Sequence, residues 1–430
     1  MIMSAAPADL DLVIFGATGF TGQLCVSYVD AAYGKTIKWG VAGRSRAKLE
    51  QVVATRCTSG KSSPAILVAD ANDEAAIERL VASTRVVIST AGPYSRYGTT
   101  LVKTVVQQGK GYCDITGEIP WVRSMVERFD AQARQTGARV VHLCGHDSVP
   151  WDLSTLMLAE KLKADSNGEE QLARVEFWNR VRGSVSGGTI ETAMALATGS
   201  GNQSGAVKEP TATPIGFDPL LLLPASDGKD AGPVASEFKT KLNNVRFVDF
   251  GRLSGQSEKM PVRSMFVMAG VNGSAVKRSN ALNGYGPCVV YREGSAHKNV
   301  AGAILMASAQ YLFGLLVIFP PTRWLLRKYV LPKPGEGPSE EEMKRGFLVL
   351  DATAIGTRGS VLKSRMRFPT DPGYKDTARM LVESGLALAL DADKIESRGR
   401  GGVLTPAVCQ GKVLLDRLIK TGSSFEFIGQ

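Results

Sequence analysis

A glycine-rich turn near the N-terminus constrains this chain more than any other feature of its sequence. It reads Gly16-Ala17-Thr18-Gly19-Phe20-Thr21-Gly22, after an apolar run of strand length (10–15) and before apolar residues at helical spacing (20–33). Glycine tolerates positive φ and lets backbone N–H groups approach a phosphate, and a helix N-terminus favours anions. The spacing is a variant of the Gly-x-Gly-x-x-Gly fingerprint, so it predicts a dinucleotide site; a tight turn that binds nothing is the alternative.

Short apolar runs alternate with helical patterns over the first third of the chain. The expected strands are 10–15, 36–42, 65–68, 85–89, 111–114 and 138–143, and the expected helices are 20–33, 48–53, 73–82, 99–108 and 119–135. This alternation is typical of α/β proteins with parallel sheets. We therefore predict a Rossmann-type, doubly wound parallel sheet in an N-terminal domain spanning 9–150.

The end of the second expected strand indicates which dinucleotide binds. The strand runs into Gly43-Arg44-Ser45-Arg46, with no Asp or Glu at its end. In this fold an acidic residue there binds the ribose hydroxyl of NAD, whereas an arginine accommodates the 2′-phosphate of NADP. Arg44 and Ser45 therefore favour NADP(H), although they could also be the solvated start of a helix.

Other predicted cofactor contacts come from the ends of the third and fourth expected strands. In such a sheet, ligands lie beyond the carboxyl ends of the strands. The residues found there are Asp70, Ala91, Gly92 and Pro93.

A polar turn after the sixth expected strand is the first candidate for chemistry. Hydride transfer requires a group that supplies a proton or polarises the substrate, and histidine suits that task near neutral pH. The candidate catalytic residues at carboxyl-end turns are His146, Tyr94 and Tyr112, with Asp147 and Ser148 as orienting residues. The alternative is structural, because His146 could be a hinge residue and Asp147, Ser148 and Asp152 could cap the next helix.

Charge and cysteine usage narrow the classes of partner. The net charge of +10 and the pI near 9.3 fit anionic cofactors or lipid surfaces. Basic residues form no single block and aromatic residues make up 7%, so we expect no nucleic-acid partner. The six cysteines are scattered, which predicts no metal site and a reducing compartment. Residues 1–9 lack a basic leader, so we expect a cytoplasmic protein. A homodimer is a further possibility for its assembly.

The second half of the chain does not continue the regular alternation of strands and helices. Residues 151–395 suggest an α+β substrate or closure domain, with strands at 174–178, 264–268 and 288–291, a helix at 190–197, and a long Gly-, Ser- and Pro-rich loop at 199–234. The C-terminal segment 396–430 could pack back on the first domain.

One apolar segment in the second half stands out. Residues 300–319 carry no charge and precede Pro320-Pro321 and a cationic stretch with Arg323, Trp324 and Lys328. Twenty apolar residues can cross a bilayer, but catalytic sequence on both sides argues against a span. Two alternatives remain open. Residues 300–328 could lie on a membrane or lipid-droplet surface, or the helix could be buried beside an apolar substrate pocket.

Several motifs, in order along nearly the whole chain, resemble the saccharopine dehydrogenase-like oxidoreductases, a family that includes bacterial trans-acting enoyl reductases. They are the glycine turn 16–22, Ala42-Gly43-Arg44, Ala91-Gly92-Pro93-Tyr94, residues 112–118, Gly145-His146-Asp147-Ser148-Val149-Pro150, Ser186-Gly187-Gly188-Thr189, residues 278–282, Asp371-Pro372-Gly373-Tyr374 and residues 401–407. The resemblance implies a nicotinamide-dependent reductase whose second α+β domain closes over the cofactor.

The expected function is an NADP(H)-dependent oxidoreductase that reduces an apolar acyl or lipid-linked substrate by enoyl reductase-like hydride transfer. Two alternatives stay open. One is a non-catalytic NADP-binding protein on membrane or lipid-droplet surfaces, and the other is an amino-acid dehydrogenase of saccharopine type.

Overall fold

The computed structural model describes residues 10–146, 148–183, 238–249, 262–329, 337–395 and 401–429. The chain divides into two compact units. The first comprises Met1–Val149, Pro334–Gly337 and Gly373–Leu418; the second comprises Pro150–Lys333, Pro338–Pro372 and Ile419–Gln430.

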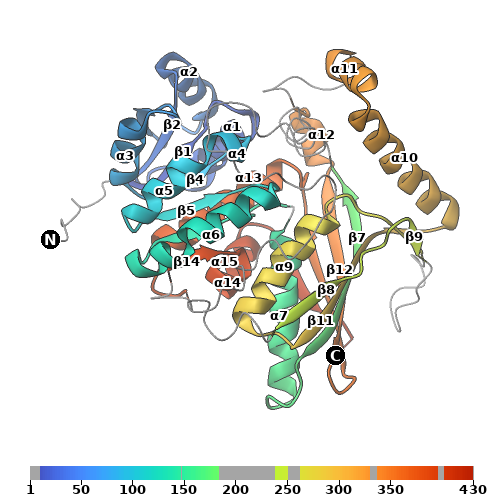
Figure 1. Ribbon diagram of the computed structural model, residues 1–430. Helices are drawn as coiled ribbons and strands as arrows, with labels where there is room; N and C mark the ends of the chain where they lie inside the picture. The colour runs from blue at the N-terminus through green and yellow to red at the C-terminus, as the bar shows by residue number, and fades with distance from the viewer. Residues whose placement is uncertain are drawn as a thin grey trace. The chain divides into compact units, whose positions relative to one another are not determined.

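The first unit is built on a seven-stranded parallel sheet in the order β14-β6-β5-β4-β1-β2-β3. Strands β1, β2, β4, β5 and β14 are labelled in Figure 1. Its strands are β1 (Leu10–Phe15), β2 (Trp39–Gly43), β3 (Ala65–Val68), β4 (Thr84–Ser89), β5 (Gly111–Asp114), β6 (Arg139–Val141) and β14 (Gly402–Leu404). Each of the strands β1 to β6 overlaps one of the predicted apolar runs, and such runs are expected for strands covered on both faces. The predicted doubly wound sheet is confirmed.

Helices form two layers on this sheet. The helices α1 (Phe20–Ala32), α2 (Arg46–Arg56) and α13 (Lys375–Leu390) pack together, and α3 (Glu74–Ala82), α5 (Thr99–Gln107) and α6 (Ile119–Thr136) form the other group. The short α4 (Tyr94–Tyr97), α14 (Pro406–Cys409) and α15 (Gly411–Lys420) complete this part of the chain. The split into two groups follows from the reversal of strand order between β1 and β4.

The C-terminal elements α13, β14, α14 and most of α15 belong to the first unit. The strand β14 pairs in parallel with β6, and α13 packs on β1, β4 and β5. The approach is close, because a Cβ on Gly385 would lie 2.5 Å from Cγ2 of Ile88. The prediction that assigned 373–395 to the second domain is therefore wrong in this part, since an apolar helix far along the chain covers the first sheet.

The second unit holds a mixed sheet in the order β15-β13-β12-β7-β11-β10-β9, with β8 paired to β11. Its strands are β7 (Leu172–Arg182), β8 (Lys239–Leu242), β9 (Val248–Asp249), β10 (Val262–Ser264), β11 (Cys288–His297), β12 (Phe347–Gly356), β13 (Val361–Phe368) and β15 (Ser424–Phe427). Its helices are α7 (Val149–Asp165), α9 (Ala269–Asn283), α10 (Val300–Ile318), α11 (Pro320–Tyr329) and α12 (Glu340–Lys344).

The predictions for the second half of the chain are partly wrong and partly lie outside the described residues. The expected strand 264–268 is wrong, because β10 ends at Ser264 and α9 begins at Ala269, where burial on nearly every side stabilises a helix despite its glycines. The expected helix 190–197, the loop 199–234 and the motif at 186–189 lie outside the described residues. The apolar segment does form a helix, α10, which is long and apolar enough to cross a membrane. Only Ala303, Ala307 and Val317 on α10 are buried, so a buried core helix is not what the structure has.

Candidate functional site

The carboxyl ends of β1 and β4 mark the place where a dinucleotide binds in sheets of this order. These two strands are neighbours, but the chain leaves β1 toward β2 and leaves β4 toward β5. The two crossovers therefore diverge and leave a crevice outside the strand ends. Most of the predicted cofactor residues follow β1, β2, β3 and β4, so the topology places them along one edge of one sheet.

The glycine turn has the close approaches that exclude side chains. Gly16 has φ +85°, and a Cβ there would lie 2.9 Å from the Ala91 nitrogen. A Cβ on Gly22 would lie 2.3 Å from the Gly16 oxygen, so only glycine lets α1 pack this tightly against the turn. At Gly19 the nearest atom to a built Cβ is 3.4 Å away, so packing alone does not demand a glycine there. A glycine that packing does not require fits the close approach of a phosphate.

Among the described residues, no side chain caps the N-terminus of α1. Its N-cap is Gly19, which offers no side-chain cap, and the first turn carries no acidic residue. The first N–H groups of a helix lack partners within the helix, and its dipole favours negative charge at that end. Ala17, Thr18, Phe20 and Thr21 line this turn; Ala17 is buried and the other three are partly exposed.

The predicted 2′-phosphate contacts are exposed at the end of β2. Arg44 is exposed and has no ion pair among the residues that the structure describes. Its neighbour Arg46 pairs with Glu50 at 3.6 Å. Ser45 caps α2, because its hydroxyl accepts from the Lys48 N–H at 3.5 Å. Arg44 is thus the cation in this turn that stays available for a phosphate.

Asp70 has a local structural role. Its carboxylate accepts the backbone N–H of Asn72 at 2.9 Å and the side-chain amide of Asn72 at 3.1 Å. These bonds form the turn between β3 and α3. Asp70 remains at the carboxyl edge, but its side chain stabilises the loop there.

A buried carboxylate fixes the loop after β4 by hydrogen bonds to its backbone. Residues 91–93 lead into α4 with a cis Gly92–Pro93 peptide. Glu118 accepts the backbone N–H groups of Tyr94 at 2.7 Å and Ser95 at 3.0 Å, so it caps α4. Its own N–H donates to the Thr116 hydroxyl at 3.0 Å. Glu118 thereby fixes Ala91, Gly92 and Pro93 beside the glycine turn.

The two candidate tyrosines are buried. The Tyr94 hydroxyl donates to the Ser89 carbonyl at 2.9 Å, and its ring stacks on Trp121 at 5.6 Å. Tyr112 is fully buried in β5. Burial, followed by the nearby Asp114 carboxylate, raises the pKa of both phenols well above their usual value. Both side chains therefore remain protonated at neutral pH. The Tyr94 hydroxyl already donates its hydrogen bond to a backbone carbonyl.

The turn after β6 contains the remaining candidates. His146 is buried, and its backbone N–H donates to the Thr377 hydroxyl at 3.0 Å. Burial lowers the pKa of the His146 imidazole to about 3, so this ring is neutral at physiological pH. The N–H of Ser148 donates to the Gly145 carbonyl at 3.3 Å, directly before α7. Asp147 lies outside the described residues.

A buried histidine–aspartate pair, which was not predicted from the sequence, lies at the same edge. The Nδ1 of His142 lies 2.7 Å from an Asp114 oxygen, and both side chains are almost fully buried. The His142 ring meets Trp121 edge-on at 5.0 Å, and its Nε2 has no partner among the described residues. The pair ties the carboxyl end of β5 to that of β6.

The residue after His142 has an unusual backbone. Leu143 has φ +67°, a conformation that costs a non-glycine residue about 1–3 kcal/mol. Its N–H donates to Asp114 at 3.4 Å. Strain of this kind clusters at functional sites. The sequence signal for this cluster is the position of Asp114, Glu118 and His142 at or just after strand ends, although residue type alone does not distinguish them from core polar residues.

Within the described ranges, no group of three His, Cys, Asp or Glu side chains is placed to hold a metal ion.

Comparison with known proteins gives matches in sequence and in structure. Residues 12–141 match the saccharopine dehydrogenase NADP-binding domain. Over 437 residues the chain is 34% identical to a protein named trans-acting enoyl reductase from Mycobacterium tuberculosis, covering 98% of each chain. It is 33% identical over 439 residues, again 98% of each chain, to the trans-acting enoyl reductase of Mycobacterium leprae. Apo saccharopine dehydrogenase (L-Glu forming) from Saccharomyces cerevisiae aligns over 97% of this chain and 99% of that chain, with a TM-score of 0.47 and 12% identity.

Proposed function

Because this chain belongs to the saccharopine dehydrogenase-like oxidoreductases, the family that includes the trans-acting enoyl reductases, we propose that it is an NADPH-dependent reductase of an apolar acyl or lipid-linked substrate. Family membership makes it an NAD(P)-dependent oxidoreductase with an NADP-binding domain.

The observation that carries the cofactor proposal is the glycine turn with its open helix end. Gly16 and Gly22 stand where a Cβ would collide with backbone, and the N-terminus of α1 has no capping side chain. A pyrophosphate bound there would accept from backbone N–H groups. The guanidinium of Arg44 would hold the 2′-phosphate, and residues 91–93 would contact the nicotinamide end.

The loops nearest the expected reaction centre favour an uncharged substrate. Those that follow β1, β4, β5 and β6, at 16–19, 90–93, 115–118 and 142–146, contain no Lys or Arg. An amino-acid dicarboxylate needs cations to bind its carboxylates. These described loops would receive an apolar acyl chain more readily than saccharopine, which makes the amino-acid dehydrogenase the weaker alternative.

When bound, NADPH supplies a hydride, and the chain must position the substrate and stabilise the charge that develops on it. In the reduction of an enoyl thioester the negative charge develops on the carbonyl oxygen. We assign to His146 the donation of a hydrogen bond from its neutral imidazole to that oxygen, because its low pKa makes it a poor general acid but an adequate electrophile. His142 and Asp114 act as positioning residues that hold the turn carrying His146.

A second candidate function is a non-catalytic NADP-binding protein. The burial of the candidate donors favours it, because the Tyr94 hydroxyl already donates to the Ser89 carbonyl and because Tyr112 and His146 are buried as well. Both functions predict NADPH binding, so only turnover separates them.

The test is NADPH oxidation by the purified chain with a panel of trans-2-enoyl thioesters of increasing length and with 2-keto acids, together with NADP⁺ reduction by the same chain with saccharopine. The proposal expects turnover with enoyl thioesters and none with saccharopine. Turnover with saccharopine alone would establish the amino-acid dehydrogenase instead. Tight NADPH binding without turnover of any substrate would leave the non-catalytic function.

A further inference from the structure

The helices α10 and α11 present their large apolar side chains to the outside. The buried residues of α10 are two alanines and one valine, Ala303, Ala307 and Val317, which lie on one stripe of the helix. The exposed residues are much larger: Leu305 is 72% exposed, Leu312 57% and Leu315 64%. Burial of large apolar side chains is the main driving force of folding. A helix that turns its small residues inward and its leucines outward is therefore suited to a second apolar environment.

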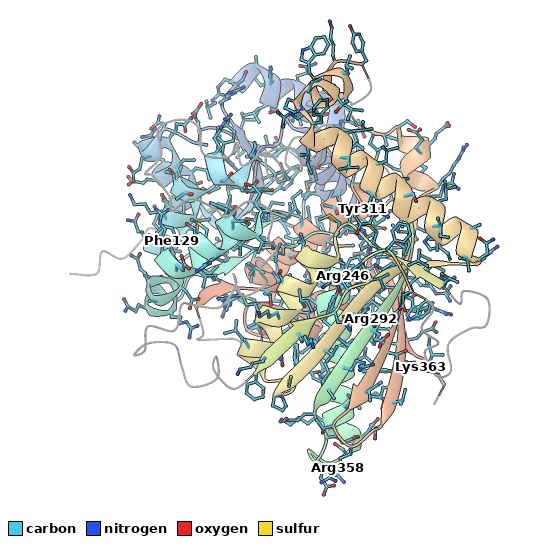
Figure 2. The ribbon with its side chains drawn as sticks, turned by 45° about the vertical axis from the view of Figure 1, so that its right-hand side comes forward. Phe129, Arg246, Arg292, Tyr311, Arg358 and Lys363 are labelled. Carbon is cyan, nitrogen blue, oxygen red and sulfur yellow. The ribbon has the colours of Figure 1, made fainter. Side chains whose placement is uncertain are left out.

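Specific contacts hold α10 against its own unit. The Gln310 side chain donates to the Met265 carbonyl at 3.2 Å, and the Tyr311 hydroxyl donates to the Arg246 carbonyl at 2.8 Å (Figure 2). The rings of Tyr311 and Phe247 lie 5.9 Å apart. These contacts fix the inner side of α10 to the segments around β9 and β10. They also fix the orientation of the helix, so its leucine-rich side remains exposed.

The following helix carries aromatic and cationic side chains of the kind found at membrane interfaces. Trp324, Leu325 and Tyr329 of α11 are exposed. The Lys328 ammonium lies over the rings of Trp324 at 4.8 Å and Tyr329 at 5.0 Å. Trp and Tyr favour the headgroup level of a bilayer, and long cationic side chains extend from there to the phosphates. The α11 helix therefore has the composition of an interfacial anchor.

The charge of this region is complementary to an anionic surface. The stretch 294–335 contains Lys298, Arg323, Arg327, Lys328 and Lys333, and it contains no Asp or Glu. Each cation near an anionic bilayer adds attraction, which salt weakens. A protein partner or a second copy could also cover leucines, but an apolar face joined to a purely basic stretch fits lipid best.

The sheet topology excludes a single membrane span. The chain enters α10 from β11 and reaches β12 after α11 and α12, and both strands pair with β7 in one sheet. Both ends of the segment must therefore lie on the same side of a bilayer. The α10 helix is about 28 Å long, enough to cross, but α11 is only about 15 Å long, too short to cross back as a second helix. An orientation along the membrane surface needs no second crossing.

From these observations we infer that α10 and α11 form a monotopic membrane anchor that lies in the headgroup region of an anionic bilayer. The exposed leucines enter the acyl boundary, and Trp324, Tyr329 and Lys328 lie at the headgroups. This inference is independent of the proposed reductase activity, because it rests on different residues and is tested without a substrate.

The test is flotation of the purified full-length protein with vesicles of phosphatidylcholine containing phosphatidylglycerol, and with vesicles of phosphatidylcholine alone. The test variant combines Leu305→Ser, Leu312→Ser and Leu315→Ser. The matched control combines three substitutions of exposed apolar residues outside α10 and α11, Val68→Ser, Val361→Ser and Ile419→Ser. Circular dichroism and size-exclusion chromatography check the fold and the oligomeric state of each protein.

We expect the wild type and the control to float with anionic vesicles. The triple leucine variant should stay folded and lose at least about 100-fold in vesicle partitioning, because three leucine side chains no longer enter the acyl region. Lys328→Glu should weaken binding to anionic vesicles only. The inference is overturned if the wild type stays in the soluble fraction with both vesicles. It is also overturned if the wild type is a dimer that the leucine substitutions dissociate, since a second copy then covers these helices.

Discussion

The neutral imidazole of His146 gives a prediction that can be worked through in numbers. Burial lowers its pKa to about 3, against about 6.5 for histidine in an unfolded chain. We therefore expect no titration of His146 between pH 5 and 8. The chain has only three histidines, so NMR signals of their imidazole protons can be assigned by comparison with His146→Gln.

The same shift has a consequence for stability. Because the folded-state pKa is depressed, the unfolded chain takes up a proton as pH falls below about 6.5, whereas the folded chain does not until about pH 3. Lowering the pH therefore favours unfolding. Between pH 7.5 and 5.5 this linkage removes about 1.4 kcal/mol from the free energy of unfolding, and the loss grows at lower pH.

The assay is urea unfolding of the wild type and His146→Gln at pH 7.5 and pH 5.5. Carboxylates with lowered pKa values, such as Asp30 and Asp391, lose stabilisation over acidic pH in both proteins, so their effect cancels in the difference. The variant should lose about 1.4 kcal/mol less than the wild type over this interval. Equal losses in the two proteins, or an imidazole of His146 that titrates near pH 6.5, would refute the assignment of a buried neutral ring.

Three further predictions concern variants at the carboxyl edge of the first sheet, where the cofactor is expected to bind. Arg44→Ala should weaken NADPH binding about 10- to 100-fold and leave NADH binding unchanged, which titration calorimetry with both nucleotides measures. Gly22→Ala should destabilise the fold by about 2–4 kcal/mol through its collision at the turn, whereas Gly19→Ala should fold normally but bind NADPH weakly, and thermal unfolding with nucleotide titration compares the two. Glu118→Gln should cost about 1.5–3 kcal/mol of stability because one carboxamide oxygen replaces two acceptors, whereas the exposed control Glu127→Gln should change the unfolding free energy by no more than about 0.5 kcal/mol.

The first sheet was predictable because its signal is local. Each of its sequential strands is a short apolar run, and each run is followed by a turn and a helical pattern. The Gly16 and Gly22 positions also carried their own physical requirement, since a side chain at either would meet backbone. Such features can be read without knowing the rest of the chain.

Features that depend on distant contacts were harder to predict. The α13 helix covers the first sheet although nearly 300 residues separate it from β4, and nothing in its own sequence says which sheet it covers. Asp114 and His142 meet only because parallel strands end at the same edge. The pKa of His146 is a property of burial, which residue type does not reveal. The roles of the predicted site residues, the cytoplasmic location and a homodimer all remain predictions.

The central claim is hydride transfer from NADPH to an enoyl substrate, and the fate of the hydrogen tests it most directly. The measurement is mass spectrometry of the product formed from a trans-2-enoyl thioester and NADPH deuterated at C4 of the nicotinamide. The proposed function predicts one deuterium at C3 of the saturated acyl chain and one solvent-derived hydrogen at C2. A recovered substrate that carries no deuterium, with NADPH bound but not oxidised, would contradict the account.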